Sequence, residues 1–294
     1  MSDRSMRTLR TTAGVLATAI ALASCAADAS TRDSATDETA PASTSPTSRA
    51  TGSAGGAQRR ASPARPPAKG CYVLGFDAAT EPTNDSRPVP CFKRHTAQTY
   101  HVGRLDTVVE GHLLAVDSEM AQRQVERTCP RKLVEYVGGS PEARALSRLE
   151  AVWFSPTIEQ SDQGASWFRC DVVAVGRPST LAPLPPPGRL RGILDRSDAL
   201  DDVGLCGTAA PGARGFERVI CSRRHAWRAI STIEISGGAP YPGIAQVREA
   251  GARECRERVQ AATGSPERFS YGWEWPTREQ WRAGQRFGYC WAPD

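Results

Sequence analysis

The chain has 294 residues, 39% hydrophobic and 23% charged, and its 37 Lys and Arg against 32 Asp and Glu give a formal net charge of +5. The basic residues are scattered, with no strip of alternating basic and aromatic residues, so the composition argues against a nucleic-acid partner. Nine cysteines favour an exported protein in an oxidising compartment.

Residues 1–25 have the pattern of a bacterial lipoprotein signal peptide. Arginines at the start precede an apolar run, 13–23, that is too short to be a permanent transmembrane helix. The run ends in Leu-Ala-Ser-Cys, which resembles the lipobox, where the signal is cut before a cysteine that becomes acylated; ordinary signal cleavage nearby is the alternative. Several acyl chains anchor a protein stably. We therefore expect a lipid on Cys25 and a position on the outer face of the cytoplasmic membrane.

Residues 26–68 predict a disordered linker. They contain no aromatic residue and no Val, Ile, Leu or Met. Such a segment cannot bury enough apolar surface to offset the entropy lost on ordering. It would tether the rest of the protein to the membrane.

The remainder of the chain contains one pattern twice, which predicts two tandem modules, 69–176 and 201–294, joined by a Pro-rich linker, 177–200. The segments 153–170 and 273–290 are identical at seven of eighteen positions without a gap. The identical pairs are Trp153/Trp273, Pro156/Pro276, Thr157/Thr277, Glu159/Glu279, Gln160/Gln280, Gly164/Gly284 and Cys170/Cys290. The prolines and glycines indicate a shaped loop that returns as a strand.

Strands are expected early in each module. The first opens with the apolar stretch 70–74. A second anchor, Cys-x-base-Arg-His, ends at His95 in one copy and at His225 in the other. The residues that follow alternate between apolar and polar, most clearly at 227–235, and a period of two predicts a strand.

A helix is expected around the third cysteine of each module. Cys129 follows Ala121 and Val125 at intervals of four, and Pro130 is expected to end that helix. The second copy runs Val247, Gly251, Cys255, Val259. A further short helix is predicted after each Gly-Ser-Pro-Glu, at 139–142 and 264–267, with serine as the N-cap. The fold class is thus α+β, each module being a small mixed sheet with one or two helices.

Once Cys25 is set aside, eight cysteines remain, four in each module. If each module closes on itself, three pairings are possible within it. The preferred pairing joins the first two cysteines and the last two of each module: Cys71 with Cys91, Cys129 with Cys170, Cys206 with Cys221, and Cys255 with Cys290.

Three chemical sites were weighed against structural alternatives. The repeated Cys-x-x-x-His could suggest a zinc site, but each cysteine can instead form a disulfide in an oxidising compartment. We therefore predict no metal or cofactor. His95 and His225 are expected to bond backbone groups. A Cys–His nucleophile would need a free thiol, and none remains if Cys25 is lipidated and the other eight cysteines form disulfides. Glu159 and Glu279 could suggest a carboxylate pair, but they are copies of one position, and carboxylates that bond backbone amides are the simpler expectation.

Tryptophan offers the best candidate for ligand contact. Of seven tryptophans, most should lie in the cores of such small domains. Trp275 and Trp281 replace serines of the first copy. If a subset of the tryptophans is exposed, these two are the candidates, able to stack on sugar rings or to contact a protein.

The order of these features resembles the septum-formation-related domain of actinobacterial lipoproteins and membrane proteins. The resemblance covers 70–175 and 201–294 and is carried best by Cys91/His95, Pro156/Thr157, Pro276/Thr277, Trp281 and Cys290. Ser161 in place of Trp281, and Ile220 in place of Pro90, depart from the pattern. The resemblance implies an extracytoplasmic module linked to cell division, with no established catalytic residues.

The functional expectation is a non-enzymatic, lipid-anchored envelope binding or scaffold protein. Its partners would be the membrane, through the lipid, and an envelope protein or wall glycan. A scaffold predicts an exposed apolar patch, a glycan-binding protein predicts exposed tryptophans, and a cell-wall enzyme, the remaining alternative, predicts a pocket with converging polar groups.

Overall fold

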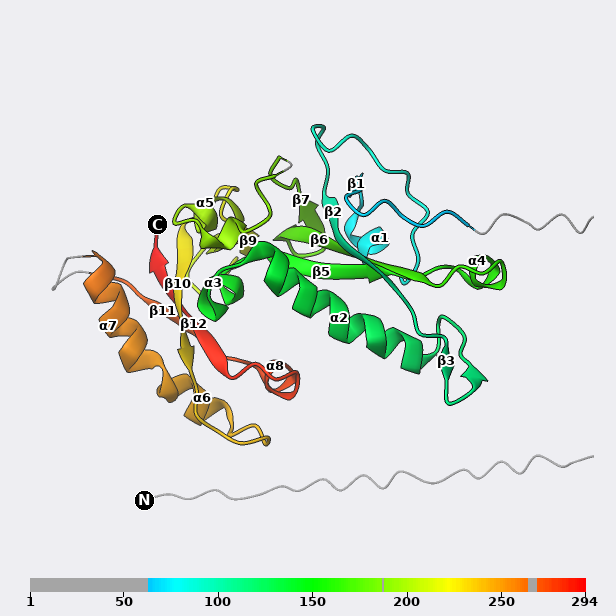
Figure 1. Ribbon diagram of the computed structural model, residues 1–294. Coiled ribbons are helices and arrows are strands. Elements are labelled where there is room, and N and C mark those ends of the chain that lie inside the picture. The colour runs from blue at the N-terminus through cyan, green and yellow to red at the C-terminus, as the bar shows by residue number, and fades with distance from the viewer. Residues whose placement is uncertain (1–62, 187, 264–268) are drawn as a thin grey trace, which may run out of the picture. The chain divides into compact units, whose positions relative to one another are not determined.

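The computed structural model describes residues 63–186, 188–263 and 269–294 (Figure 1). The signal peptide, Cys25 and most of the predicted linker lie outside these residues. The described chain is α+β, with two five-stranded sheets, one two-stranded sheet, and helices. Among the described helices, none has the length and apolarity needed to cross a membrane.

The first sheet is built around its longest strand, β6. Its order is β1-β2-β6-β5, and β7 also pairs with β6. Every pairing is antiparallel. The expectation of a mixed sheet was wrong here because both long neighbours of β6 run opposite to it. The strands are β1 (Cys71–Tyr72), β2 (Ala97–Arg104), β5 (Leu149–Phe154), β6 (Trp167–Arg177) and β7 (Thr180–Ala182).

The second sheet has the order β11-β12-β10-β8-β9, again wholly antiparallel. Its strands are β8 (Leu205–Gly207), β9 (Arg218–Ile220), β10 (Trp227–Glu234), β11 (Gly272–Glu274) and β12 (Phe287–Pro293). Matched by their cysteines, β1, β2, β6 and β5 of the first sheet stand in the same order as β8, β10, β12 and β11 of the second.

The main helix of the first half, α2 (Glu119–Val137), continues through Pro130. The prediction that the helix ends there was wrong. A proline inside a helix lacks one backbone hydrogen bond, but the turns beyond it bury Tyr136 and Val137, and the preceding turn is held by the disulfide at Cys129. Packing therefore outweighs the local preference.

The second half has two helices in this place, α6 (Ile244–Ala250) and α7 (Ala252–Thr263). The break falls at Gly251, and a β-carbon there would come within 2.3 Å of the Trp273 ring. The single helix expected from the spacing is thus divided where the indole packs against the backbone.

Short elements complete the fold. Ser140 caps α3 (Pro141–Ala145) as the sequence predicts, whereas its counterpart at 264–267 lies outside the described residues. The two repeated loops contain a helical turn each, α4 and α8. The remaining pieces are α1 (Phe76–Thr80), α4 (Ile158–Asp162) and α8 (Arg278–Arg282), and a hairpin of β3 (Val108–Val109) and β4 (His112–Leu113).

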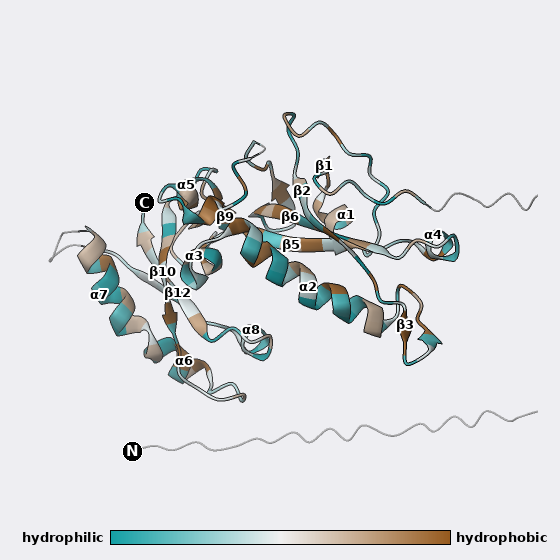
Figure 2. Cartoon of the chain, viewed as in Figure 1, coloured by the Kyte–Doolittle hydropathy of each residue, from teal (hydrophilic) through white to brown (hydrophobic). Residues whose placement is uncertain are grey.

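The segment 177–200 is not the simple linker predicted from its prolines. It forms β7, the 3-10 turn η1 (Ile193–Asp195) and the start of α5 (Ala199–Val203). Its apolar side chains enter a core shared by both halves, and Figure 2 shows hydrophobic residues on β6, β7 and β9. This core includes Val137, Leu149, Val172, Ala174, Leu184, Leu190, Ile193, Ala199, Val203 and Ile220.

The described residues form four disulfides, which join the pairs preferred from the sequence. Two of them link a helix to the strand beneath it: Cys129 of α2 to Cys170 of β6, and Cys255 of α7 to Cys290 of β12. All four of these cysteines are fully buried. The disulfides therefore fix the helix on each sheet.

Candidate functional site in the grooves beside the edge strands

The repeated loops owe their identical residues to helix capping. Thr157 and Thr277 each accept a hydrogen bond from the backbone N–H three residues on, and the glutamine there bonds back to the threonine N–H. The pKa values of Glu159 and Glu279 are lowered by hydrogen bonds from their own backbone N–H groups and from the capping threonines. Figure 1 shows α4 and α8 well apart, so these carboxylates do not form one acid-base pair.

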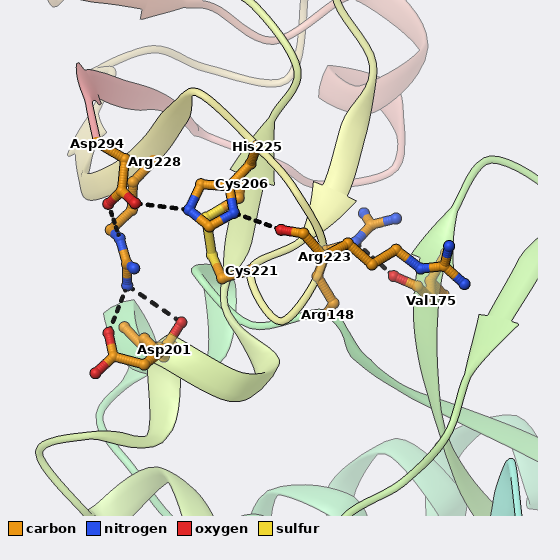
Figure 3. Close-up of a disulfide and its surroundings, with 10 residues drawn as sticks. Arg148, Val175, Asp201, Cys206, Cys221, Arg223, His225, Arg228 and Asp294 are labelled. Atoms are coloured by element: carbon orange, nitrogen blue, oxygen red, sulfur yellow. Dashed lines mark hydrogen bonds and ion pairs between the residues drawn. A yellow bond between two sulfur atoms is a disulfide. The ribbon is translucent and has the colours of Figure 1, made fainter.

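The two repeated histidines bond backbone carbonyls, as expected. Nδ1 of His95 lies 2.8 Å from the Lys93 carbonyl oxygen, and Nδ1 of His225 lies 2.6 Å from that of Arg223. Figure 3 shows His225 beside the disulfide between Cys206 and Cys221. Within the described part of the chain, no three His, Cys, Asp or Glu side chains are grouped so that they could hold a metal ion.

His225 belongs to a network of hydrogen bonds and ion pairs (Figure 3). Its Nε2 is 2.7 Å from Oδ2 of Asp294, whose Oδ1 accepts from Nε of Arg228 at 2.7 Å. Arg228 also donates to Asp201 of α5 at 2.7 Å. Hydrogen bonds from Arg228 hold the pKa of Asp294 below its usual value. These contacts tie Asp294, which follows β12, through Arg228 of β10 to α5.

A buried ion pair distinguishes the first sheet. Nε of Arg169 lies 3.0 Å from Oδ2 of Asp171, and Thr99 donates to Oδ1 at 2.7 Å. The guanidinium lies over the rings of Tyr72 and Phe154, 3.9 and 4.5 Å from their centroids. Burial raises the pKa of Asp171 to about 6, although Arg169 and Thr99 act in the opposite direction. Both side chains are buried in the sheet, so the ion pair has a structural role.

Trp281 is not an exposed ligand contact. Its side chain is fully buried, and its indole N–H donates to the carbonyl oxygen of Gly238 at 3.2 Å. Tyr241 and Arg286 pack on the ring at 6.0 and 4.3 Å. The sequence expectation was wrong because the loop before α6 folds over this indole, a contact between segments more than forty residues apart in the chain.

Trp275 lies in a groove between β11 and the helices α6 and α7. The groove has a volume of about 690 Å³ and is lined by Arg248, Glu249, Tyr271, Trp273 and Trp275, among others. Trp275 is half-buried, Tyr271 is 40% exposed, and the Arg248 guanidinium lies 5.7 Å from the Trp275 ring centroid. Aromatic and charged side chains thus share one open surface.

The first half has a groove between the same kinds of element, the edge strand β5 and the helix α2. Its volume is about 490 Å³. The lining comprises Pro130, Leu133, Val134 and Val137 of α2, Leu149, Glu150, Ala151 and Trp153 of β5, Arg144 and Ala145 of α3, and Ser147. Val134 is 42% exposed. We call this the α2–β5 groove; its lining is mainly apolar.

The residues of the α2–β5 groove were not singled out from the sequence. The apolar face of the helix that carries Ala121, Val125 and Cys129 continues at helical spacing through Pro130, Leu133, Val134 and Val137. Because the helix is expected to end at Pro130, the sequence does not point to these residues. A second signal was Ala151, which stands where the second copy has Tyr271. A small residue in place of a large one leaves space beside the strand.

The comparison with protein families agrees with the order of cysteines, histidines and capped loops in this fold. The family model described as septum formation matches residues 71–290. The chain belongs to the septum formation family. The match to this family runs through both sheets and the segment between them. No curated protein and no solved structure matches the chain.

Proposed function

We propose that this member of the septum formation family is a lipid-anchored, non-enzymatic envelope protein that works by binding another protein. The observation that carries the proposal is the α2–β5 groove, an open surface with apolar side chains such as Leu133, Val134 and Trp153. Exposed apolar surfaces of this kind mark sites of protein interaction. The four disulfides would keep the groove in shape outside the cytoplasm.

The test of binding is a pull-down with the intact, disulfide-bonded chain against membrane extracts and against purified wall glycan. Val134→Glu places a charge in the groove and should abolish retention of a membrane protein. Ile158→Glu is the matched control, because Ile158 is 45% exposed on α4 and does not line the groove. Equal retention by all three proteins would contradict binding in the groove.

Anchoring and septal location need separate tests. Cys25→Ser should release the protein from the membrane fraction, because the lipid would have no attachment site. A fluorescent fusion should concentrate at the septum of dividing cells. A uniform membrane signal would argue against the division role, and membrane retention of the Cys25→Ser variant would argue against the anchor.

A second candidate function, glycan binding, is favoured by the groove that contains Trp275. The rings of Trp275 and Tyr271 could stack on sugars while Arg248 and Glu249 bond hydroxyl groups. Trp275→Ala should then weaken retention on wall glycan at least about tenfold, the effect of losing one good stacking contact. Trp153→Ala, in the other groove, should leave glycan retention unchanged; equal losses would count against the assignment.

We also infer that the two halves arose as tandem copies of one module. The shared strand order, the matching disulfides and the two identical capping boxes support this inference. Exchange of residues 156–160 with 276–280 should change the free energy of unfolding by less than about 0.5 kcal/mol. A large loss of stability in urea unfolding would show that the loops are not equivalent.

A further inference from the structure

One edge of the first sheet is open along β5. The strand pairs with β6 alone among the described strands. The N–H of Val175 donates to the carbonyl oxygen of Arg148 at 2.9 Å, so the backbone groups of Val175, and by alternation those of Val173 and Asp171, face β5. Their partners on β5 are Glu150 and Val152, and the backbone groups of Leu149, Ala151 and Trp153 therefore point away from β6.

The open stretch has defined ends. At one end the N–H of Arg148 donates to the carbonyl oxygen of Val203 at 2.7 Å, and at the other the N–H of Ser155 donates to that of Pro82 at 2.9 Å. Between them, the structure shows no backbone partner for the N–H groups of Ala151 and Trp153 among the described residues. Unpaired strand edges accept a further strand, and this one has room for about five residues.

The α2–β5 groove runs along this open edge. Figure 1 shows α2 alongside β5, and four α2 side chains at helical spacing line the groove opposite the strand. Extended peptides bind other proteins in this arrangement: the backbone extends the sheet, and alternate side chains enter pockets against the helix. Leu133 and Val134 offer apolar contacts for such side chains.

The second half carries two aromatic side chains at the corresponding position. Aligned through the repeated tryptophan, Leu149 and Ala151 correspond to Phe269 and Tyr271. Those two rings lie 6.4 Å apart, and the guanidinium of Arg256 on α7 lies 6.0 Å from the Phe269 ring centroid. The first groove has the smaller residues Leu149 and Ala151 at these two positions, so its lining there is aliphatic, whereas the second groove is lined by an aromatic ring, Tyr271.

Two charged side chains line the groove, Arg144 and Glu150, and Arg144 favours an acidic group on the occupant. Arg144 lines the groove, and one terminal nitrogen of its guanidinium donates to the carbonyl oxygens of Gly138 and Gly139. No carboxylate within ion-pair distance of Arg144 is found in the part of the chain that the structure describes. Its remaining N–H groups can donate hydrogen bonds to a carboxylate of a ligand.

We propose that the α2–β5 groove binds an extended segment of a partner protein as an added strand beside β5. The segment carries apolar side chains at alternate positions and an acidic side chain at the end next to Arg144. The protein's own residues 26–68 are a poor occupant, since they lack every large apolar residue type. This inference rests on the proposed function as a protein-binding protein and names the kind of segment that it binds.

The test begins with a phage-displayed library of random 12-residue peptides selected on the intact, disulfide-bonded chain. We expect selected peptides to alternate apolar residues and to contain an acid. Ala151→Pro should weaken their binding about tenfold or more, because it removes an outward N–H and fills the edge without disturbing the ladder to β6. Ala245→Pro, a control at the first turn of α6 in the other groove, should leave the affinity unchanged.

Two measurements separate strand addition from a general effect on folding. Methylation of alternate backbone nitrogens of the best peptide should abolish binding in one register and leave it nearly intact in the other, since only every second N–H would face β5. Arg144→Gln should reduce the preference for the acidic peptide over its amide analogue from at least about tenfold towards one. A structural defect would weaken both peptides equally.

The outcomes also distinguish this inference from the proposed function. If no peptide is selected, or if selected peptides bind the Ala151→Pro protein equally well, the proposal of an added strand beside β5 is overturned. A membrane protein that is still retained in the pull-down and lost with Val134→Glu would leave the proposed function standing. A second copy of this chain could also occupy the groove, which would be detected as dimers that the Ala151→Pro protein does not form. That result would overturn the proposal that the occupant is a segment of a partner protein.

Discussion

The backbone N–H of Leu205 donates to the carbonyl oxygen of Leu146 at 2.7 Å. This bond joins the start of the second sheet to the residues just before β5. The Arg148–Val203 bond lies next to it, and the shared core of α2, β6, η1, α5 and β9 is built around the same junction. The two halves should therefore unfold together.

Substitution of Ile193 tests this joint core. Ile193 is 2% exposed and lies in the connecting segment. Ile193→Ala should lower the free energy of unfolding by about 2–4 kcal/mol, because it removes buried methyl groups and leaves a cavity. Urea unfolding followed by tryptophan fluorescence should still show one transition. Ile158→Ala, at an exposed position, should change stability by less than about 0.5 kcal/mol; two separate transitions would refute a shared core.

Asp171 should make stability depend on pH. Its pKa in the folded protein is about 6, above the usual 3.8, so the folded state holds this proton more tightly than the unfolded state. The resulting stabilisation is complete below pH 4 and is lost as the pH rises through 6, in all about 3 kcal/mol.

The check is urea unfolding at several pH values between 4 and 7 with the protein and with Asp171→Asn, which cannot ionise. The difference in unfolding free energy between the two proteins isolates Asp171 from other titrating groups. It should change across this pH range; a constant difference would show that the buried carboxyl does not titrate there.

The two tryptophans first expected to contact ligands should differ in their effect on stability. Trp281→Ala should destabilise the protein by about 3–5 kcal/mol, since it empties a fully buried site. Trp275→Ala should have a smaller effect because the side chain is only half-buried. Thermal unfolding monitored by circular dichroism can compare them, and similar losses for both would contradict the burial difference.

The disulfides should stabilise in the order of the loops that they close. Cys129 and Cys170 are separated by 41 residues in sequence, and Cys206 and Cys221 by 15. In the chain-entropy model, removal of the first bond lowers stability by about 4 kcal/mol and removal of the second by about 3 kcal/mol. Paired Cys→Ala variants compared by urea unfolding measure both values. A reversed order would indicate that local packing, rather than loop closure, dominates.

Much of the local structure could be predicted because it depends on neighbouring residues. Thr157 and Ser140 act as helix caps through hydrogen bonds that span three residues. The alternation after His225 produces the strand β10, with Ala229, Ser231 and Ile233 buried. The failure at Pro130 has the same explanation in reverse, since a local rule was overridden by burial of Tyr136 and Val137 far from the proline's own turn.

The candidate site could be predicted only in part. Trp275 was singled out and lies in a groove, but Trp281 was singled out for the same reason and is buried. Both replace serines of the first copy, so the repeat comparison gives them equal weight. What separates them is the loop that contains Gly238, which covers one indole and leaves the other accessible.

The sequence by itself determined the doubled pattern of cysteines, the preferred disulfide pairs, the capped loops and the α+β class, because these follow from spacing and from residue chemistry within short stretches. Only the tertiary structure decided that the Pro-rich segment joins a common core, that Trp281 is enclosed, and that β5 keeps an open edge beside α2. Each of these depends on which distant segments come to lie together. A strand edge is open or closed according to its neighbours in space, and its own residues do not specify them.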